Sequence, residues 1–123
     1  MPKINIRVTL KNNNSDITKE TTGFFHDDKI NYIEEDNTKM VFDYRDKTLL
    51  RETNNLRMNF KFEENKETLL KMTYKELDAD MEIPIKTNKI EINDKNIEIE
   101  YELKNENEKE FFIYRIEEIK WVY

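Results

Sequence analysis

The sequence predicts an all-β protein, folded as a single antiparallel up-and-down barrel of about 8–10 strands. Three observations support this fold class. Apolar residues alternate with polar ones over most of the chain, as in MEIPIKTNKIEINDKNIEIEYEL at 81–103. The segments between these stretches are about four residues long, which is too short for the crossover that parallel strands require. No stretch of about ten residues shows the helical period of 3.6 residues.

The alternation places the strands in order along the chain. It is weakest at 17–25, and 63–77 is rich in helix formers, which compete with a strand there. Groups of Asn, Asp, Glu and Lys separate the apolar stretches and predict turns, including a tight one at His26-Asp27-Asp28-Lys29. The expected strands are 4–10, 17–25, 30–33, 40–44, 49–52, 56–62, 70–74, 77–85, 90–92, 97–103 and a last one that begins at 111 or 112 and runs toward 123.

Two places disturb the alternation. Pro84 has no amide hydrogen, so it belongs at a bulge or where strand pairing is interrupted. Near the carboxyl end, the apolar residues change from even positions to odd ones around Glu117-Glu118, which predicts a bulge. If the register is kept instead, one aromatic row is exposed and becomes a partner surface. The even row is Phe112, Tyr114 and Ile116, and the odd row is Ile119, Trp121 and Tyr123.

Closure of the sheet follows from the number of strands. An open meander of this length leaves two long edges that invite aggregation, and a barrel removes them. Ten strands spaced ~4.8 Å apart and tilted ~40° give a radius of roughly 10 Å. We therefore expect an axial cavity inside the barrel.

Length and composition exclude several classes of protein. The chain of 123 residues fits one domain, 1–123. It has no Cys, which removes disulfides and thiol chemistry, and its net charge of −6 disfavours nucleic acid as a partner. There is neither a secretion signal nor a membrane span, so the protein is expected to be soluble, cytoplasmic and not membrane-bound. The sequence leaves open whether it is a monomer or a homodimer.

Several motifs resemble a known family. They are TTGFF at 21–25, MNF at 58–60, MEIPIKT at 81–87 and IEIEYEL at 97–103. Together they make nearly the whole chain similar to the YwiB-like bacterial β-barrel family of unknown function (DUF1934). The resemblance implies a calycin-like barrel, related to lipocalins and fatty-acid-binding proteins, with an internal pocket. It implies no activity, and this chain departs from the family in having Gly23 as its single glycine.

No catalytic, metal or cofactor site is predicted. His26-Asp27-Asp28 is the one histidine beside carboxylates, and a polar hairpin tip explains it without a metal. Adjacent glutamates on a strand point to opposite faces, so pairs such as Glu117-Glu118 cannot flank one substrate. One His and one Gly allow neither a catalytic triad nor a glycine-rich phosphate loop.

The arginines are the strongest candidates for ligand binding, because a planar guanidinium suits a buried anion. Arg51 shares its face with Leu49, and Arg115 shares its face with Phe111 and Ile113, so either can point inward. The alternative is a structural arginine that stacks on Trp121 or closes one end of the barrel. Hydroxyls that could assist the arginines belong to Tyr44, Tyr74, Tyr101 and Tyr114.

The strand at 17–25 has the poorest apolar stripe, so its polar residues can wet a cavity. Thr21 and Thr22 are the candidates, while Gly23 beside them is explained by a bulge or a sharp bend. The first functional hypothesis is therefore a non-enzymatic barrel that binds a small, partly apolar molecule inside, either neutral or anionic. The second is an interaction or scaffold module with a filled core, and an enzyme of unknown reaction is the third.

Overall fold

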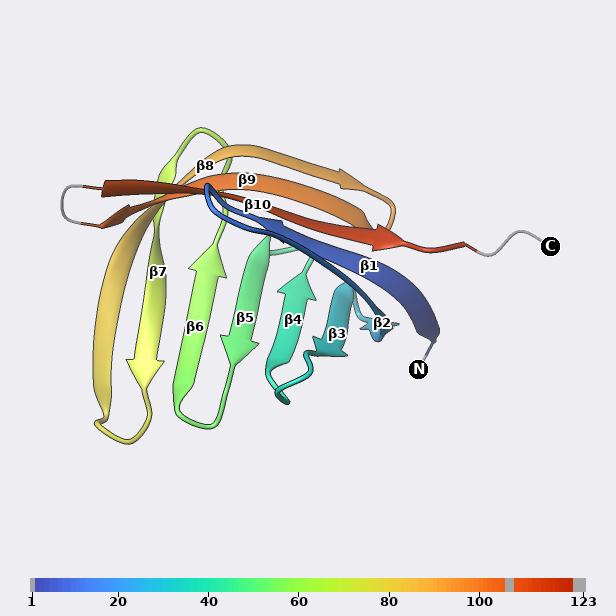
Figure 1. Cartoon of the computed structure of the whole chain (residues 1–123), viewed down its shortest axis with the longest axis horizontal. Helices are drawn as coiled ribbons and strands as arrows, with labels where there is room; N and C mark the ends of the chain where they lie inside the picture. The colour runs from blue at the N-terminus through green and yellow to red at the C-terminus, as the bar shows by residue number, and fades with distance from the viewer. Residues whose placement is uncertain (1, 106–107, 121–123) are drawn as a thin grey trace.

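The computed structural model describes residues 2–105 and 108–120, which form ten antiparallel strands in a closed barrel (Figure 1). Each strand pairs with its neighbours in the chain, and β1 closes the barrel by pairing with β10. The predicted all-β, up-and-down barrel is thus confirmed. The strands are β1 (Lys3–Lys11), β2 (Asp16–His26), β3 (Lys29–Ile33), β4 (Lys39–Asp43), β5 (Thr48–Glu52), β6 (Leu56–Lys61), β7 (Glu67–Tyr74), β8 (Ala79–Asn93), β9 (Asn96–Asn105) and β10 (Glu108–Glu118).

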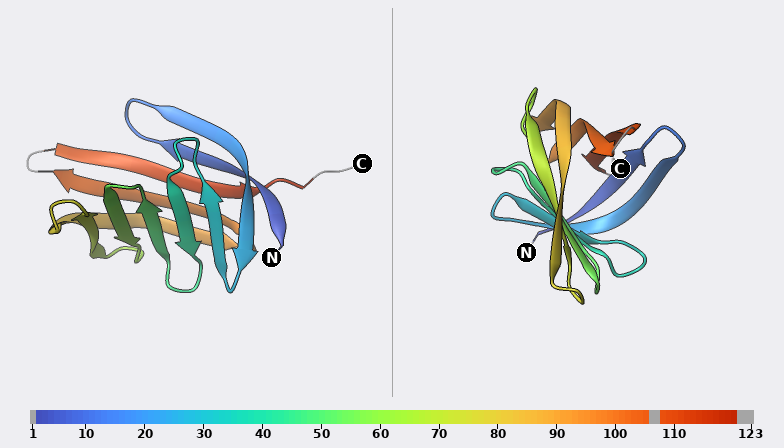
Figure 2. Two further views of the ribbon diagram at one scale, coloured as in Figure 1. Left: turned by 90° about the horizontal axis from the view of Figure 1, so that it is seen from below. Right: turned by 90° about the vertical axis from the view of Figure 1, so that its left-hand side faces the viewer.

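The barrel is flattened into two layers that cross steeply. Strands β3 to β7 form one layer, while β9, β10 and β1 run across them in the other (Figures 1 and 2). Strand β8 belongs to both layers, because its first part pairs with β7 and its second part pairs with β9. Apolar faces of the two layers meet inside, as expected for orthogonally packed sheets.

Strand β8 corrects the prediction of two separate strands at 77–85 and 90–92. Its register shifts between Thr87 and Lys89, so Asn88 is an extra residue. This bulge changes the inward side chains from odd to even positions, which keeps both Ile85 and Ile90 against the core. Pro84 is not at the bulge. Pro84 lies one residue before the part of β8 that pairs with β9, which begins at Ile85. Its missing amide hydrogen therefore costs no hydrogen bond to β9.

The turns use Asn and Asp where glycine is usual. The predicted hairpin after His26 is confirmed, since Asp27 and Asp28 both have positive φ between β2 and β3. Short polar side chains tolerate this left-handed conformation better than other residues do. Among the described residues, those with positive φ are Lys47 and six Asn or Asp residues, namely Asp27, Asp28, Asn37, Asn65, Asp78 and Asp94. A chain with one glycine can therefore still form these short turns.

The bulge expected at Glu117-Glu118 is absent. Strand β10 keeps one register against β1 through Glu118, and Ile119 donates a backbone hydrogen bond to Asn5 at 2.8 Å. The even row predicted from the sequence does point inward, and Tyr114 and Ile116 are buried. In the odd row, Trp121 and Tyr123 lie outside the described residues.

The middle of the barrel is filled by side chains rather than by an axial cavity. Tyr101 packs between Phe62 and Phe112, with ring centroids 5.2 and 5.1 Å away. Phe42 and Ile99 are fully buried in the same core. The flattening brings the two layers close enough for side chains to meet across the interior, which a round barrel of ten strands would not allow.

Gly23 has a packing role rather than a conformational one. Its φ is not positive, and β2 stays in register with β1 through it. A Cβ atom here would lie 3.1 Å from Cγ1 and Cδ1 of Ile30 and 3.3 Å from Cδ1 of Ile6. The predicted bulge is therefore absent, and the backbone of β2 instead comes close to two core side chains at this position.

Candidate functional site: a cavity between β2 and β3

The candidate site begins where two strands separate. Strand β2 pairs with β1 along its length from Asp16 to Phe24, but it pairs with β3 only at Phe24, Phe25 and His26. Beyond these pairs the β1–β2 hairpin diverges from β3, as Figure 2 shows. The inner face of β2 is the least apolar in the barrel. Further pairing of β2 with β3 would therefore bury little apolar surface and be only weakly stabilised.

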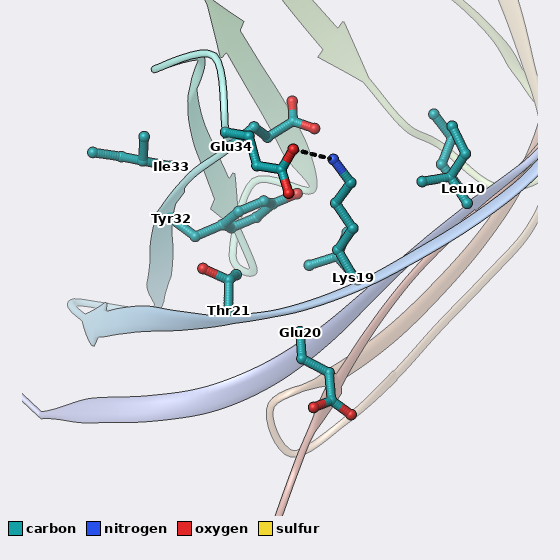
Figure 3. A pocket seen from close by; sticks show the side chains of 10 residues that line it. Leu10, Lys19, Glu20, Thr21, Tyr32, Ile33 and Glu34 are labelled. Atoms are coloured by element: carbon teal, nitrogen blue, oxygen red, sulfur yellow. Dashed lines mark ion pairs between the residues drawn. The ribbon is translucent and has the colours of Figure 1, made fainter.

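A cavity of about 210 Å³ occupies this gap (Figure 3). Val8 and Leu10 of β1 and Ile17 of β2 form apolar walls. Thr21 and Tyr32 add hydroxyl-bearing side chains from the two sides of the gap. The site therefore combines apolar surface with a few polar groups, which is typical of small-molecule sites.

Charged side chains stand at the rim of the cavity in two ion pairs. Lys19 Nζ lies 3.3 Å from a carboxylate oxygen of Glu35 (Figure 3). Arg51 Nε lies 3.6 Å from a carboxylate oxygen of Glu34. These pairs are substantially exposed, so each holds its geometry only weakly and can exchange partners with a ligand. Glu20 also borders the cavity, but its carboxylate points away from it and pairs with Arg7 at 3.0 Å.

Tyr32 links the cavity to the core. Its hydroxyl is hydrogen-bonded to the hydroxyl of Tyr114, which is buried on β10. Burial raises the pKa of Tyr32 well above its ordinary value of 10.0, and the pKa of Tyr114 is raised for the same reason. Both side chains therefore stay neutral near pH 7 and act as hydrogen-bonding groups.

The structure separates the two predicted arginines. Arg51 points to the inner face of β5, with Met40 and Met58 as its cross-strand neighbours, and it lies beside the cavity through Glu34. Arg115 does not point inward. It lies on the outer face of β10, because the buried side chains of that strand are at even positions, and its guanidinium binds Glu98 on β9.

The Arg115 pair belongs to an ionic cluster on the outer surface. Lys89 Nζ lies 2.9 Å from the second oxygen of Glu98, so this carboxylate is held between two cations. Lys89 and Arg115 together lower the pKa of the Glu98 carboxyl. An anion clamp built from Arg51 and Arg115 is excluded, since the two guanidinium groups are on opposite faces of the sheet.

The predicted tyrosines are distributed over the barrel and do not form one site. Tyr114 reaches the cavity only through Tyr32. Tyr101 is buried in the aromatic core, and Tyr44 donates a 2.6 Å hydrogen bond to the backbone carbonyl of Lys95 at the other end of β3 and β4. Tyr74 is half-buried at the end of β7, where it pairs with strands β6 and β8.

Of the two predicted threonines, Thr21 lines the cavity and Thr22 is exposed on the outer face. Alternation allows only one of two adjacent residues to point inward, and this signal was present in the sequence. The same rule puts Lys19 on the face of Thr21, although it was not predicted as a site residue. Tyr32 was also missed, because its contact with Tyr114 joins residues 82 positions apart.

Within the ranges 2–105 and 108–120, no group of three His, Cys, Asp or Glu side chains is placed to hold a metal ion. The same ranges contain no helix that is long and apolar enough to cross a membrane.

Comparison with known proteins supports the fold and the family. The crystal structure of ywiB protein from Bacillus subtilis is similar to this chain, with a TM-score of 0.55 and 14% sequence identity. The match covers 96% of this chain and 91% of that chain, so it shows a shared barrel fold. A search of curated proteins gave no match. A family profile described as "Domain of unknown function (DUF1934)" matches residues 3–116, and the chain therefore belongs to the DUF1934 family.

Proposed function

We propose that this protein is a non-catalytic barrel that binds a small, partly apolar molecule in the cavity between β2 and β3. The observation that carries the proposal is the cavity of about 210 Å³ with apolar walls on the β1–β2 hairpin and the Tyr32 side chain opposite. Pockets for drug-sized ligands enclose roughly 300–1,000 Å³, so the ligand is smaller than these. A fused pair of aromatic rings or a short branched acyl group has a suitable size.

The polar groups of the cavity favour binding over catalysis. Tyr32 stays protonated near pH 7 because burial raises its pKa, so it offers a hydrogen bond rather than a base. Lys19 and Glu35 neutralise each other at the rim. Proton transfer near neutral pH needs a group whose pKa is close to that pH, and the raised pKa of Tyr32 moves this tyrosine further from that range.

Lys19 is the group that would select an anionic ligand. Its side chain is on the inner face of β2, beside Thr21, and about half of it is exposed to solvent. A ligand carboxylate would replace that of Glu35 as its partner. Arg51 on β5 is a second cation beside the cavity and is paired with Glu34, whereas Arg115 is on the outer surface.

A second candidate function is protein interaction. Leu10, Ile17 and Ile33 all line the cavity and are exposed at 37%, 50% and 62%. Exposed apolar residues gathered at one place mark interaction surfaces more often than isolated ones do.

The test uses two probes that differ in charge, naphthalene-2-carboxylate and naphthalene-2-carboxamide. Binding is measured by chemical-shift titration of the backbone amides and by thermal unfolding. At 100 times the dissociation constant, a bound probe adds ~2.7 kcal/mol to the free energy of unfolding. We expect Thr21→Trp, which fills the cavity, to abolish binding, and Thr22→Trp on the outer face to retain it.

The charge of the ligand is tested with Lys19→Met. This variant should weaken binding of the carboxylate and leave binding of the carboxamide unchanged. Equal binding by Thr21→Trp and Thr22→Trp, or no saturable binding of either probe by the unmodified protein, would refute the proposed function.

A further inference from the structure

Strand β2 has an edge whose backbone groups face the gap instead of a neighbouring strand. In an antiparallel pair, successive residues direct their N–H and C=O groups alternately to one side and the other. Asn12 donates to the carbonyl of Ser15 at 2.9 Å, and Phe25 donates to the carbonyl of Pro2 at 3.2 Å. These two bonds fix which residues of β2 bond to β1. They are the odd-numbered residues 15–25, which leaves the even-numbered ones for the other side.

The free groups lie directly beside the cavity. The backbone N–H and C=O groups of Phe24 and His26 face β3, because pairing with that strand is confined to residues 24–26. Within the described part of the chain, no strand is paired with the gap side of 16–22. The backbone groups that face the gap belong to Asp16, Thr18, Glu20 and Thr22. The side chains between them that point inward, from Ile17 to Thr21, line the cavity.

We infer that this edge of β2 binds an extended peptide segment of a partner, antiparallel to β2, with alternate side chains in the cavity. The inference rests on the proposed function, because it names the class of ligand that the same cavity would take. Addition of a strand to an exposed sheet edge supplies main-chain hydrogen bonds for affinity, and pockets for alternate side chains supply specificity. Both parts are present here, with the free edge and the cavity side by side.

The surroundings define the chemistry of the peptide. Residues opposite Ile17 and Thr21 would point into the cavity and should be apolar. Residues opposite Asp16 and Glu20 would point outward, beside two carboxylates that pair with Lys11 at 3.8 Å and Arg7 at 3.0 Å and whose side chains are still 60% and 58% exposed. Opposite charges in cross-strand pairs are favourable, so these positions should be Lys or Arg. The net charge of −6 steers a basic segment toward the protein in the same sense.

Lys19 protects the free edge of β2 against indiscriminate pairing with strands of other molecules. A charged side chain that points inward on an edge strand is a device by which natural sheets avoid indiscriminate edge-to-edge pairing. The ammonium group of Lys19 need not occupy the cavity, because it can stay paired with Glu35 at the cavity rim, where the two groups are 3.3 Å apart. An apolar peptide side chain can then enter between Ile17 and Tyr32.

The probe for this inference is a fluorescein-labelled heptapeptide, Lys-Val-Lys-Leu-Lys-Val-Lys, with capped ends, and binding is followed by fluorescence anisotropy. Thr18→Pro removes an amide hydrogen that faces the gap without removing one that bonds to β1. Thr18→Ala is the matched control, because both variants lose the contact with the Thr9 hydroxyl. We expect Thr18→Pro to weaken binding at least about tenfold and Thr18→Ala to retain it.

Backbone methylation of the peptide gives a second, independent readout. In an antiparallel addition, the peptide residues that face Asp16, Thr18 and Glu20 direct their amides toward β2. N-methylation of the central lysines should therefore abolish binding, and N-methylation of the valines should leave it unchanged. Equal effects of the two methylation patterns, equal binding by the two Thr18 variants, or no saturable binding of the peptide would each overturn the inference.

Naphthalene-2-carboxylate separates this inference from the proposed function. If Thr18→Pro and the unmodified protein both bind the carboxylate but neither binds the peptide, the peptide inference falls and the small-molecule site stands. If the peptide binds and the carboxylate never does, the small-molecule proposal falls while the strand addition is supported.

Discussion

The seam between β9 and β10 and the seam between β2 and β3 show what closes this barrel. The first is paired without interruption from Glu108 to Ile116, and its inner side chains, including Ile99, Tyr101 and Tyr114, are buried. The second is paired only at residues 24–26, and the inner face of β2 beyond that point carries Lys19 and Thr21. Strand pairing thus extends as far as the apolar inner face does, because burial of these side chains supplies the free energy that stabilises the pairing. The open seam is where polar inner residues leave room for a ligand.

The largest expected effect is on the stability of the whole barrel at high pH. Burial raises the pKa values of Tyr32, Tyr101 and Tyr114 above the ordinary value of 10.0. Above pH 10 the unfolded chain loses these protons while the folded chain keeps them. The contribution of these tyrosines to the free energy of unfolding is therefore fully present below pH 10 and falls above it, by up to about 1.4 kcal/mol per pH unit for each tyrosine.

Tyrosinate absorbance and circular dichroism, followed together in an alkaline titration, measure this effect. We expect these tyrosines to ionise only as the β signal is lost. Ionisation of all six tyrosines near pH 10 with the β signal intact would show that the core is not closed around them.

The second effect compares a buried ring with an exposed one. Phe62 is fully buried against Tyr101, and Phe62→Ala should lower the free energy of unfolding by about 3–5 kcal/mol, through lost burial and the resulting cavity. Phe111 on the outer face of β10 is 47% exposed, and Phe111→Ala should change it by less than about 0.5 kcal/mol. Denaturant unfolding of both variants checks this. Similar losses for the two would mean that the inner and outer faces are wrongly assigned.

The third effect lies at the junction of the two regions. Gly23→Val adds side-chain atoms where a Cβ already meets Ile30 at 3.1 Å, and overpacking of this kind should cost about 1–3 kcal/mol. Ile30→Val removes the Cδ1 atom in that contact, so the double variant should be less destabilised than the sum of the single ones. Strictly additive changes in the free energy of unfolding would indicate that the two residues do not compete for space.

The smallest effect is expected on the outer surface. Arg115→Ala removes one partner of Glu98 but leaves Lys89, so the free energy of unfolding should fall by less than about 1 kcal/mol. Binding of naphthalene-2-carboxylate should not change, because Arg115 is on the opposite face from the cavity. A loss of binding in Arg115→Ala comparable to that in Lys19→Met would contradict this assignment of faces.

Alternation was sufficient to predict most strands but not the points where its phase changes. The change between Ile85 and Ile90 is absorbed by the Asn88 bulge within one strand, whereas near Glu117 the strand simply ends in register. In the sequence the two cases look the same, because in both the apolar residues change from odd to even positions or the reverse. The sequence alone therefore does not tell a bulge from a strand end. For the site, both Thr21 and Thr22 were predicted, although alternation allows only one of them to point inward and Thr21 is the one that lines the cavity. Lys19 and Tyr32, which line the cavity from opposite sides, were not predicted.

The sequence by itself determined that the strands are antiparallel and that their apolar stripes face inward, because period-two alternation and short connections permit little else. It also favoured closure of the sheet, because an open sheet of this many strands leaves two exposed edges. Only the tertiary structure decided how flat the barrel is and where its interior remains open. These depend on which side chains meet across the two layers, as Phe62 meets Tyr101 and Tyr32 meets Tyr114. Such contacts join distant parts of the chain, so they cannot be predicted from a local pattern. Because side chains fill the barrel axis, the cavity lies at the seam between β2 and β3 and not on the axis, where it was expected.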